Sequence, residues 1–237
     1  MFALSLAAAV VTVVVAAAVQ GVTGSGFGIV AAPVLIVLWP QVIPGTLLWL
    51  ATAVCTLTAT RERSHVDWPF VQRCCAAAVP GTAVGFAIAE ALPAHILMMC
   101  VGTVVVASGI AGLAGARVPI TGGTTLAAGV GAGMLNYLAA LPGPPVALTY
   151  RGPSAATVRS TLSAIFAVLS VATLALLAAG NRTSPHDAAV AGLLLGPVLV
   201  GFAVAIPLSR RVSATTVSRA ALMLSVLGGA ALVIRTW

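Results

Sequence analysis

Long apolar runs constrain this chain more than any other feature of its sequence. A membrane-spanning helix takes about 20 apolar residues, and eight runs approach or exceed that length, at 2–22, 44–60, 74–90, 95–115, 120–138, 155–179, 188–208 and 215–234. A soluble fold must cover its surface with polar side chains, yet only 6% of these residues are charged, against about 25% in a typical soluble domain. We therefore expect an all-α polytopic membrane protein with about eight full spans and two broken or re-entrant segments, and exclude a soluble enzyme and a disordered chain.

The positive charge of the chain points to membrane topology and not to nucleic acid. The formal net charge is +7, every basic residue among the eleven Lys and Arg is an arginine, and these arginines lie between the apolar runs. Sparse cations at such positions orient a protein in the cytoplasmic membrane. Aromatic residues make up only 5% of the chain, which leaves no platform for stacking bases. We expect the partners to be the lipid bilayer and a small molecule, with no nucleic acid; a homodimer is left open.

Two short apolar pieces, 27–38 and 143–150, each follow a long run across a break in the helical pattern. The first break is rich in glycine, from Gly21 to Gly28, and the second is rich in proline, from Leu141 to Pro145. They fall at corresponding places in the two halves of the chain, which we take as repeats over 1–118 and 119–237 of one transmembrane domain. Paired interruptions of this kind indicate the binding site of a secondary transporter. A glycine run that only allows close helix packing is the alternative.

The arginines discriminate between two ways of threading the breaks. If each broken segment crosses the membrane once, the arginines divide six to five between the two sides. If each break turns the chain back, nine lie on one side and two, Arg182 and Arg235, on the other. The second division agrees with the positive-inside rule. It predicts inverted repeats in the inner (cytoplasmic) membrane with both termini outside, and the first apolar run as a retained helix and not a signal peptide.

The chemistry of the breaks suits a small anion. Helix starts inside the membrane present free N–H groups and a positive dipole end, which together bind anions without a basic side chain. The candidate substrate-binding residues are Gly24, Ser25, Gly26, Phe27, Gly28, Asn136, Pro142, Gly143, Pro144 and Pro145. Glu90 is a candidate coupling residue, with a solvated interfacial carboxylate as the alternative. Arg159 is a candidate cavity residue, with a loop cation that sets orientation as the alternative.

The breaks resemble the motifs of the TauE/SafE family of sulfite-exporter-type permeases. The first motif, G-x-x-G-x-G-G-G-x-x-x-x-P, is matched from Gly21 to Pro33 except at Phe27. The second, G-x-x-N followed by G-x-G-G-P-P, is matched from Gly133 to Pro145 with Ala140 and Pro142 in place of glycines. The resemblance implies a permease for small sulfur-containing anions such as sulfite or organosulfonates. Phe27 narrows the first break, and Pro142 removes a backbone donor from the second.

The leading hypothesis is therefore a secondary transporter that works by alternating access around a midplane anion site. An anion channel is the alternative, and an intramembrane enzyme is less favoured because no histidine lies within a span to act as base for Ser25. No cofactor and no metal site are expected. The cysteines lack metal-ligand or CxxC spacing and are expected to be small apolar side chains: Cys55, Cys74, Cys75 and Cys100.

Overall fold

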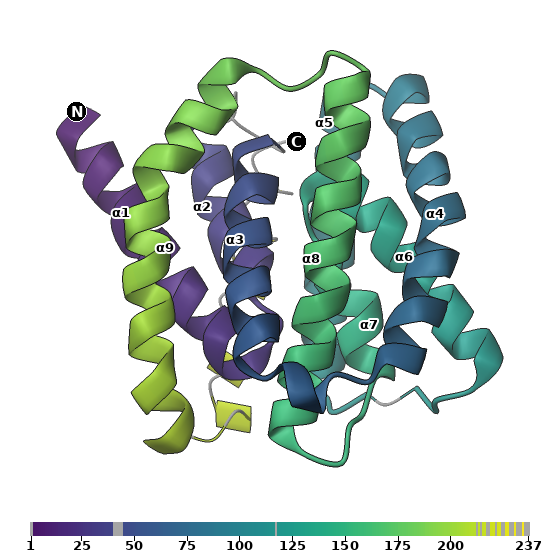
Figure 1. Ribbon diagram of the computed structural model, residues 1–237. Helices are drawn as coiled ribbons and strands as arrows, with labels where there is room; N and C mark the ends of the chain where they lie inside the picture. The colour runs from purple at the N-terminus through teal and green to yellow at the C-terminus, as the bar shows by residue number, and fades with distance from the viewer. Residues whose placement is uncertain are drawn as a thin grey trace.

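The computed structural model describes residues 2–39, 45–116 and 118–211, with scattered positions between 213 and 234. Within these residues every regular element is helical, which confirms the all-α class (Figure 1). The elements are α1 (Phe2–Thr23), α2 (Phe27–Leu38), α3 (Gly45–Arg61), the 3₁₀ turn η2 (Arg63–His65), α4 (Trp68–Ala91), α5 (Ala94–Leu113), α6 (Gly122–Ala139), α7 (Gly143–Thr149), α8 (Ala155–Ala179) and α9 (Pro185–Arg211). Arg117, Arg235 and half of the residues of the expected span 215–234 lie outside the described residues.

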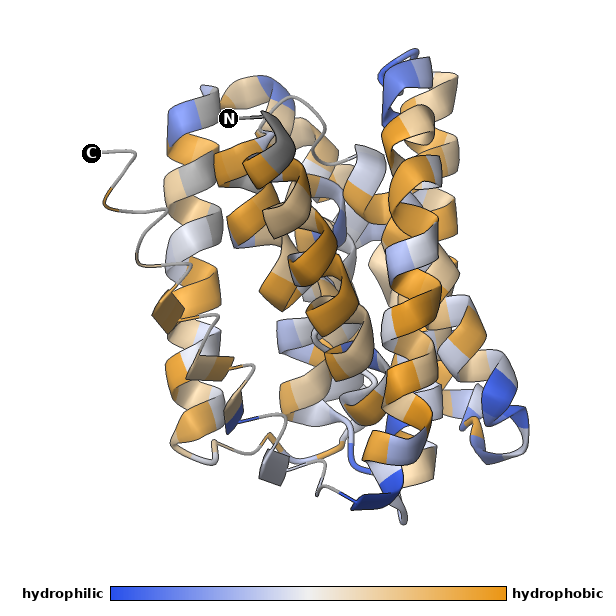
Figure 2. Ribbon diagram, turned by 90° about the vertical axis from the view of Figure 1, so that its left-hand side faces the viewer, coloured by the Kyte–Doolittle hydropathy of each residue, from blue (hydrophilic) through white to orange (hydrophobic). Residues whose placement is uncertain are grey.

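Five of the described helices are long and apolar enough to cross a membrane, and they support a multi-pass membrane protein. They are Leu4–Thr23, Trp68–Ala91, His95–Leu113, Ala155–Ala179 and Pro185–Arg211. Orange apolar positions run along the helices, and hydrophilic residues gather toward the helix ends and connections (Figure 2). Large apolar side chains such as Leu193 and Val200 on α9 are exposed on the outside of the molecule. Lipid, and not water, is the solvent that these side chains suit.

Helix starts follow from local capping chemistry. The Asp67 carboxylate caps α4 by accepting a hydrogen bond from the Phe70 N–H at 3.1 Å, as is typical of an N-cap aspartate. Ser154 caps α8 in the same way through the Thr157 N–H. Asp187 lies in the first turn of α9, where its carboxylate accepts from the Ser184 N–H. These caps set where the long helices begin and so fix the lengths of the connections between them.

Both breaks turn the chain back on itself. In Figure 1 the chain descends along α1 and rises along α2, and α6 and α7 repeat this reversal. The end of α3 lies against the end of α1, because Arg61 donates to the Gly21 carbonyl. The end of α4 lies at the opposite face, where Glu90 pairs with Arg182. We call the first of these faces the arginine-rich end. Arg61 and Arg159 lie there because they donate to carbonyls in the last turn of α1, and α9 ends on the same side with Arg210 and Arg211 in its last turn (Figure 1).

Glycines let two pairs of helices pack with their backbones in near contact. A Cβ atom on Gly133 of α6 would lie 2.1 Å from the Ala78 carbonyl oxygen of α4. A Cβ atom on Gly201 of α9 would lie 2.3 Å from the Val14 carbonyl oxygen of α1. Both pairs run parallel, and both depend on small residues, as is typical of helix association in lipid.

We expect Gly133→Ala to destabilise the protein by about 1–3 kcal/mol, because the added methyl group must displace the backbone of α4. Gly192→Ala on α9 is the matched control, since a Cβ atom there meets nothing within 4 Å and alanine favours helix. Thermal unfolding of the purified proteins in one detergent measures both effects. Equal melting temperatures for the two variants would contradict the packing described for α4 and α6.

Candidate functional site: two helix breaks that meet

The two breaks touch each other inside the bundle. We define the first break as Gly24–Gly26 and the second as 140–142, between α6 and α7. A Cβ atom on Gly28 would lie 2.6 Å from the Ala140 carbonyl oxygen, so only glycine permits this approach. Ala140 itself is left-handed, with φ of 54°, at a position where the family motif has glycine. Segments more than 100 residues apart in sequence thus form one site.

Gln20 holds the first break in place. Its side chain is 1% exposed, and its Oε1 accepts a hydrogen bond from the Phe27 N–H at 3.1 Å. Its Nε2 donates to the Gly24 carbonyl at 2.8 Å and contacts Cys55 Sγ and Ser163 Oγ. The amide therefore satisfies the non-helical backbone on both sides of the break, which a membrane interior requires.

The start of α2 leaves two backbone donors open. Phe27 donates to Gln20 and Val30 to the Gly26 carbonyl, but the N–H groups of Gly28 and Ile29 have no acceptor within the described chain. These are the orphan donors that any helix start carries. Both residues line a cavity together with residues of the second break, at the positive end of the dipole of α2.

The second break has fewer donors than the first. In the first turn of α7 only Gly143 and Val146 carry an N–H, because Pro144 and Pro145 have none. Asn136, four residues before Ala140, is fully buried, and its Nδ2 donates to the Leu169 carbonyl and to Thr173 Oγ1 of α8. The two helix starts are therefore not equivalent, because prolines replace two of the backbone donors at the start of α7.

A small cavity lies where the breaks meet. We call it the break cavity; its volume is about 20 Å³, and it is lined by Gln20, Gly26–Ile29, Ala51, Cys55, Ala140–Gly143, Phe166 and Ser170. About 10–15 Å³ of such space accommodates one water molecule. The break cavity is therefore large enough for one water molecule but too small for an oxyanion. Ser170 is 1% exposed, and its hydroxyl has no hydrogen-bond partner in the described chain. An unpaired buried donor of this kind is costly unless a ligand or water satisfies it.

A much larger cavity opens toward the arginine-rich end. This vestibule has a volume of about 580 Å³, and Arg151 and Arg219 line it together with Ser25, Tyr150 and Pro144. It also has apolar walls from Val105, Leu148 and Leu162. The vestibule thus leads from cationic side chains to the edge of both breaks.

The candidate residues fall into three groups. Five line the break cavity: Gly26, Phe27, Gly28, Pro142 and Gly143. Two line the vestibule: Ser25 and Pro144. Three line neither cavity: Gly24, which packs on the Arg159 backbone, Asn136, and Pro145, which faces Gly131.

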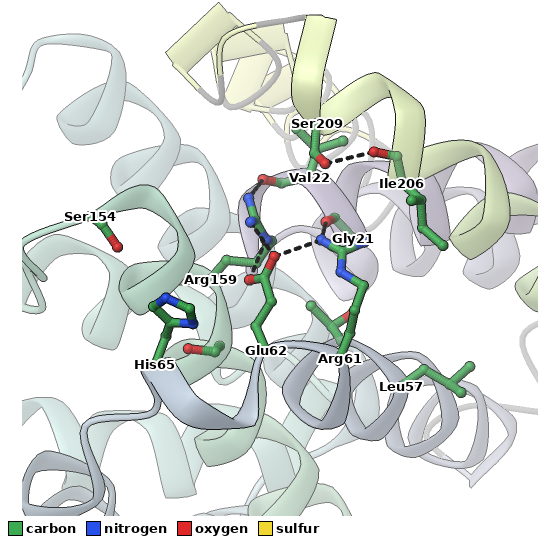
Figure 3. A network of polar contacts seen from close by, with 12 residues as sticks. Gly21, Val22, Leu57, Arg61, Glu62, His65, Ser154, Arg159, Ile206 and Ser209 are labelled. Carbon is green, nitrogen blue, oxygen red and sulfur yellow. Dashed lines mark hydrogen bonds and ion pairs between the residues drawn. The ribbon is translucent and has the colours of Figure 1, made fainter.

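Arg159 braces the first break from outside the cavities. Its guanidinium donates to both carboxylate oxygens of Glu62, with the Nε contact at 2.9 Å, and to the Val22 carbonyl at 3.1 Å (Figure 3). Arg61 donates to the same carboxylate and to the Gly21 carbonyl. The two arginines therefore satisfy carbonyls in the last turn of α1, where the helix dipole favours positive charge.

Glu62 is the acidic residue that sequence reasoning missed. Burial alone would raise the pKa of its carboxyl, but the guanidinium groups of Arg159 and Arg61 hold that pKa below its ordinary value. Glu90 is instead about half exposed and pairs with Arg182 at the opposite end, so its place matches the solvated alternative. The adjacent charges of Arg61 and Glu62 at the end of an apolar run could have indicated an ion pair. Their partner Arg159, however, lies 97 residues after Glu62 in the chain.

The described residues include no cluster of three or more His, Cys, Asp or Glu that would hold a metal ion. All four cysteines are free thiols, and Cys55 and Cys74 are buried.

Buried, paired helix breaks in an all-helical membrane protein define a polytopic protein of the transporter type. The family model described as sulfite exporter TauE/SafE matches residues 9–232, and the chain belongs to this family. This match confirms the resemblance that the two motifs indicated. The family is one of membrane transporters for sulfur-containing anions. Neither the curated proteins nor the solved structures gave a match.

We expect Glu62→Gln to destabilise the protein by about 3 kcal/mol at neutral pH, because it leaves the buried Arg159 and the partly buried Arg61 without their carboxylate. Arg182→Gln breaks the exposed pair at the opposite end and serves as the control, with little expected change. Thermal unfolding measures both. If the two variants are equally stable, the network does not brace the break.

The contribution of Glu62 depends on pH in a defined direction. A carboxyl whose pKa is lowered in the folded protein stabilises it above the unfolded pKa, and this contribution is lost as the pH falls through the folded pKa. We therefore expect the stability difference between wild type and Glu62→Gln to be constant above about pH 5 and to shrink below the ordinary glutamate pKa of about 4.3. Melting curves across this range test it, and a difference that grows toward acid pH would refute it.

Proposed function

We propose that this protein is a secondary transporter of a small sulfur oxyanion, sulfite or an organosulfonate, bound where the two breaks meet. The observation that carries the proposal is the break cavity itself. The N–H groups of Gly28 and Ile29 and the hydroxyl of Ser170 converge there without acceptors. An oxyanion is rich in acceptors and carries the charge that the start of α2 favours.

The absence of a basic side chain from the lining of the break cavity suits a transporter. The described lining of that cavity contains no arginine, so binding rests on neutral donors and a helix dipole worth a few kcal/mol at most. A site for transport must release its substrate as well as bind it. A buried arginine beside the anion would hold it more tightly and slow that release.

We also propose that the two halves are inverted repeats. The parallel pairs support this: α1 packs on α9, and α6, at the corresponding place in the second half, packs on α4. Gln20 and Asn136 are buried amides that each precede a break by a few residues, and both donate to α8. Alternating access by rocking of such repeats is the mechanism that this architecture favours.

The vestibule supports a state that faces the arginine-rich end. By the positive-inside rule that end is cytoplasmic, and the N-terminus of α1 then lies outside. The substrate would approach from the vestibule past Arg151 and Arg219, whose charges attract an anion. The break cavity must widen to accept it, because its volume of about 20 Å³ is too small for an oxyanion.

Exchange of labelled sulfite, and separately of a short alkylsulfonate, in proteoliposomes tests the transport function. We expect substrate inside the vesicles to stimulate uptake of labelled substrate. Unitary conductance without such exchange would establish a channel instead, and no flux of either anion would refute the proposal.

We expect Ser170→Ala to reduce flux at low substrate concentration about tenfold or more, because a hydrogen bond to a charged group contributes about 1.5–3 kcal/mol. Its stability should not fall, since the hydroxyl has no partner to lose. Ser209→Ala at the exposed end of α9 is the matched control. Wild-type flux in Ser170→Ala would remove Ser170 from the site.

Gly143→Val is expected to abolish flux while the protein still folds. A Cβ atom there makes only ordinary contacts, 3.8 Å from Ile29 and Phe166, but the valine side chain occupies the break cavity. Gly26 does not offer such a test, because its φ of 155° and a contact of 2.6 Å with Val19 make any side chain disruptive. Normal flux in a folded Gly143→Val protein would refute the site.

A further inference from the structure

Ile29 is the one residue that lines both the vestibule and the break cavity in the described part of the chain. It lies in the first turn of α2, and its Cδ1 atom is 3.8 Å from the position of a Cβ on Gly143, across the gap between the two breaks. Its side chain packs with Val105 of α5, Ala139 and Leu141. An apolar side chain therefore fills the space between the two cavities.

We propose that the Ile29 side chain is the barrier between the vestibule and the break cavity, and that a sulfur oxyanion passes only when this side chain moves aside. The proposal rests on the proposed function. A constriction formed by apolar groups excludes hydrated ions without any charge of its own, because water and ions do not enter a narrow apolar gap. The surroundings fit this role, since Val105 and Leu141 are buried and offer an anion no polar partner at that level.

The position of Ile29 also explains why two cavities of such different size lie side by side. The vestibule of about 580 Å³ reaches Ser25 and Pro144. The break cavity of about 20 Å³ begins at Gly26, one residue after Ser25, and at Gly143, one residue before Pro144. The side chain of Ile29 projects from the same turn of α2 that offers the free N–H groups. A shift of that turn would open the barrier and reposition the anion donors together.

Cys55 provides a native reporter for this barrier. It lines the break cavity, and its thiol is 3.3 Å from Gln20 Nε2. The test uses full-length protein with Cys74, Cys75 and Cys100 replaced by alanine, and 2-sulfonatoethyl methanethiosulfonate as the probe. The Cys55 thiolate attacks the sulfenyl sulfur of this reagent, a disulfide forms, and methanesulfinate leaves. The probe carries the same sulfonate group as the proposed substrates and must pass the barrier to react.

We expect Ile29→Ala to speed labelling of Cys55 about tenfold, the change that a barrier lower by about 1.4 kcal/mol produces. Ile29→Val, which lacks only the terminal methyl group, should give an intermediate rate and is the variant least able to disturb folding. Val37→Ala is the matched control, because Val37 lies on the same helix but is 48% exposed on its outer face. Ser108→Cys with Cys55→Ala reports on the vestibule and should be labelled fast whether or not Ile29 is replaced.

Mass spectrometry of the intact protein follows each reaction. Equal rates at Cys55 in wild type, Ile29→Val and Ile29→Ala would overturn the proposal, as would wild-type labelling of Cys55 as fast as that of Ser108→Cys. Absence of labelling in Ile29→Ala, when the vestibule cysteine has reacted fully, would also overturn it. Labelling needs no transport, so its outcome is separate from that of the exchange assay. If the protein exchanges substrate but Cys55 labelling does not depend on Ile29, the barrier alone is refuted. If labelling depends on Ile29 but no exchange occurs, the transport function alone is refuted.

Discussion

The contact between Gly28 and the Ala140 carbonyl is the constraint on which the rest of the site depends. It brings two interruptions of the helical backbone together, and any side chain at position 28 would separate them, since its Cβ would lie 2.6 Å from that oxygen. Interrupted backbone inside a membrane must find partners within the protein. Gln20 supplies them at the first break, and the Asn136 amide ties the end of α6 to α8. The Ser170 hydroxyl, which has no partner in the described chain, belongs to the lining of the break cavity.

Around this contact, charged and neutral polar side chains lie at different distances from the ends of the helix bundle. Charged groups lie toward the ends, with Arg61, Glu62 and Arg159 under the first break and Glu90 with Arg182 at the opposite end. Neutral amides and hydroxyls occupy the interior, where an unpaired charge would be far more costly. The glycine contacts of α1 with α9 and of α4 with α6 bring the backbones of these long helices into near contact.

Much of this architecture could be predicted from the sequence because it follows from local chemistry. The apolar runs, the helix starts at Phe27 and Gly143, and the cap at Asp67 each depend on residues that are neighbours along the chain. The site was predicted less completely. Gly24 and Pro145 belong to the motifs but line neither cavity. The Asn136 amide nitrogen donates its hydrogen bonds to α8. Ser170 was not singled out, since nothing in the pattern of α8 distinguishes the face that meets the breaks.

Residues that are neighbours along the chain suffice to predict a membrane protein whose helices are interrupted twice, at segments rich in glycine and proline. Those properties follow from hydrophobicity and from backbone conformation, which each residue carries with it. Helix packing, by contrast, brings the two breaks into contact, pairs Arg159 with Glu62, leaves the Ser170 hydroxyl unpaired in the described chain and places Ile29 between two cavities. Each of these is a distance between segments remote in sequence, and such distances are set by how helices pack, which no short window of residues encodes.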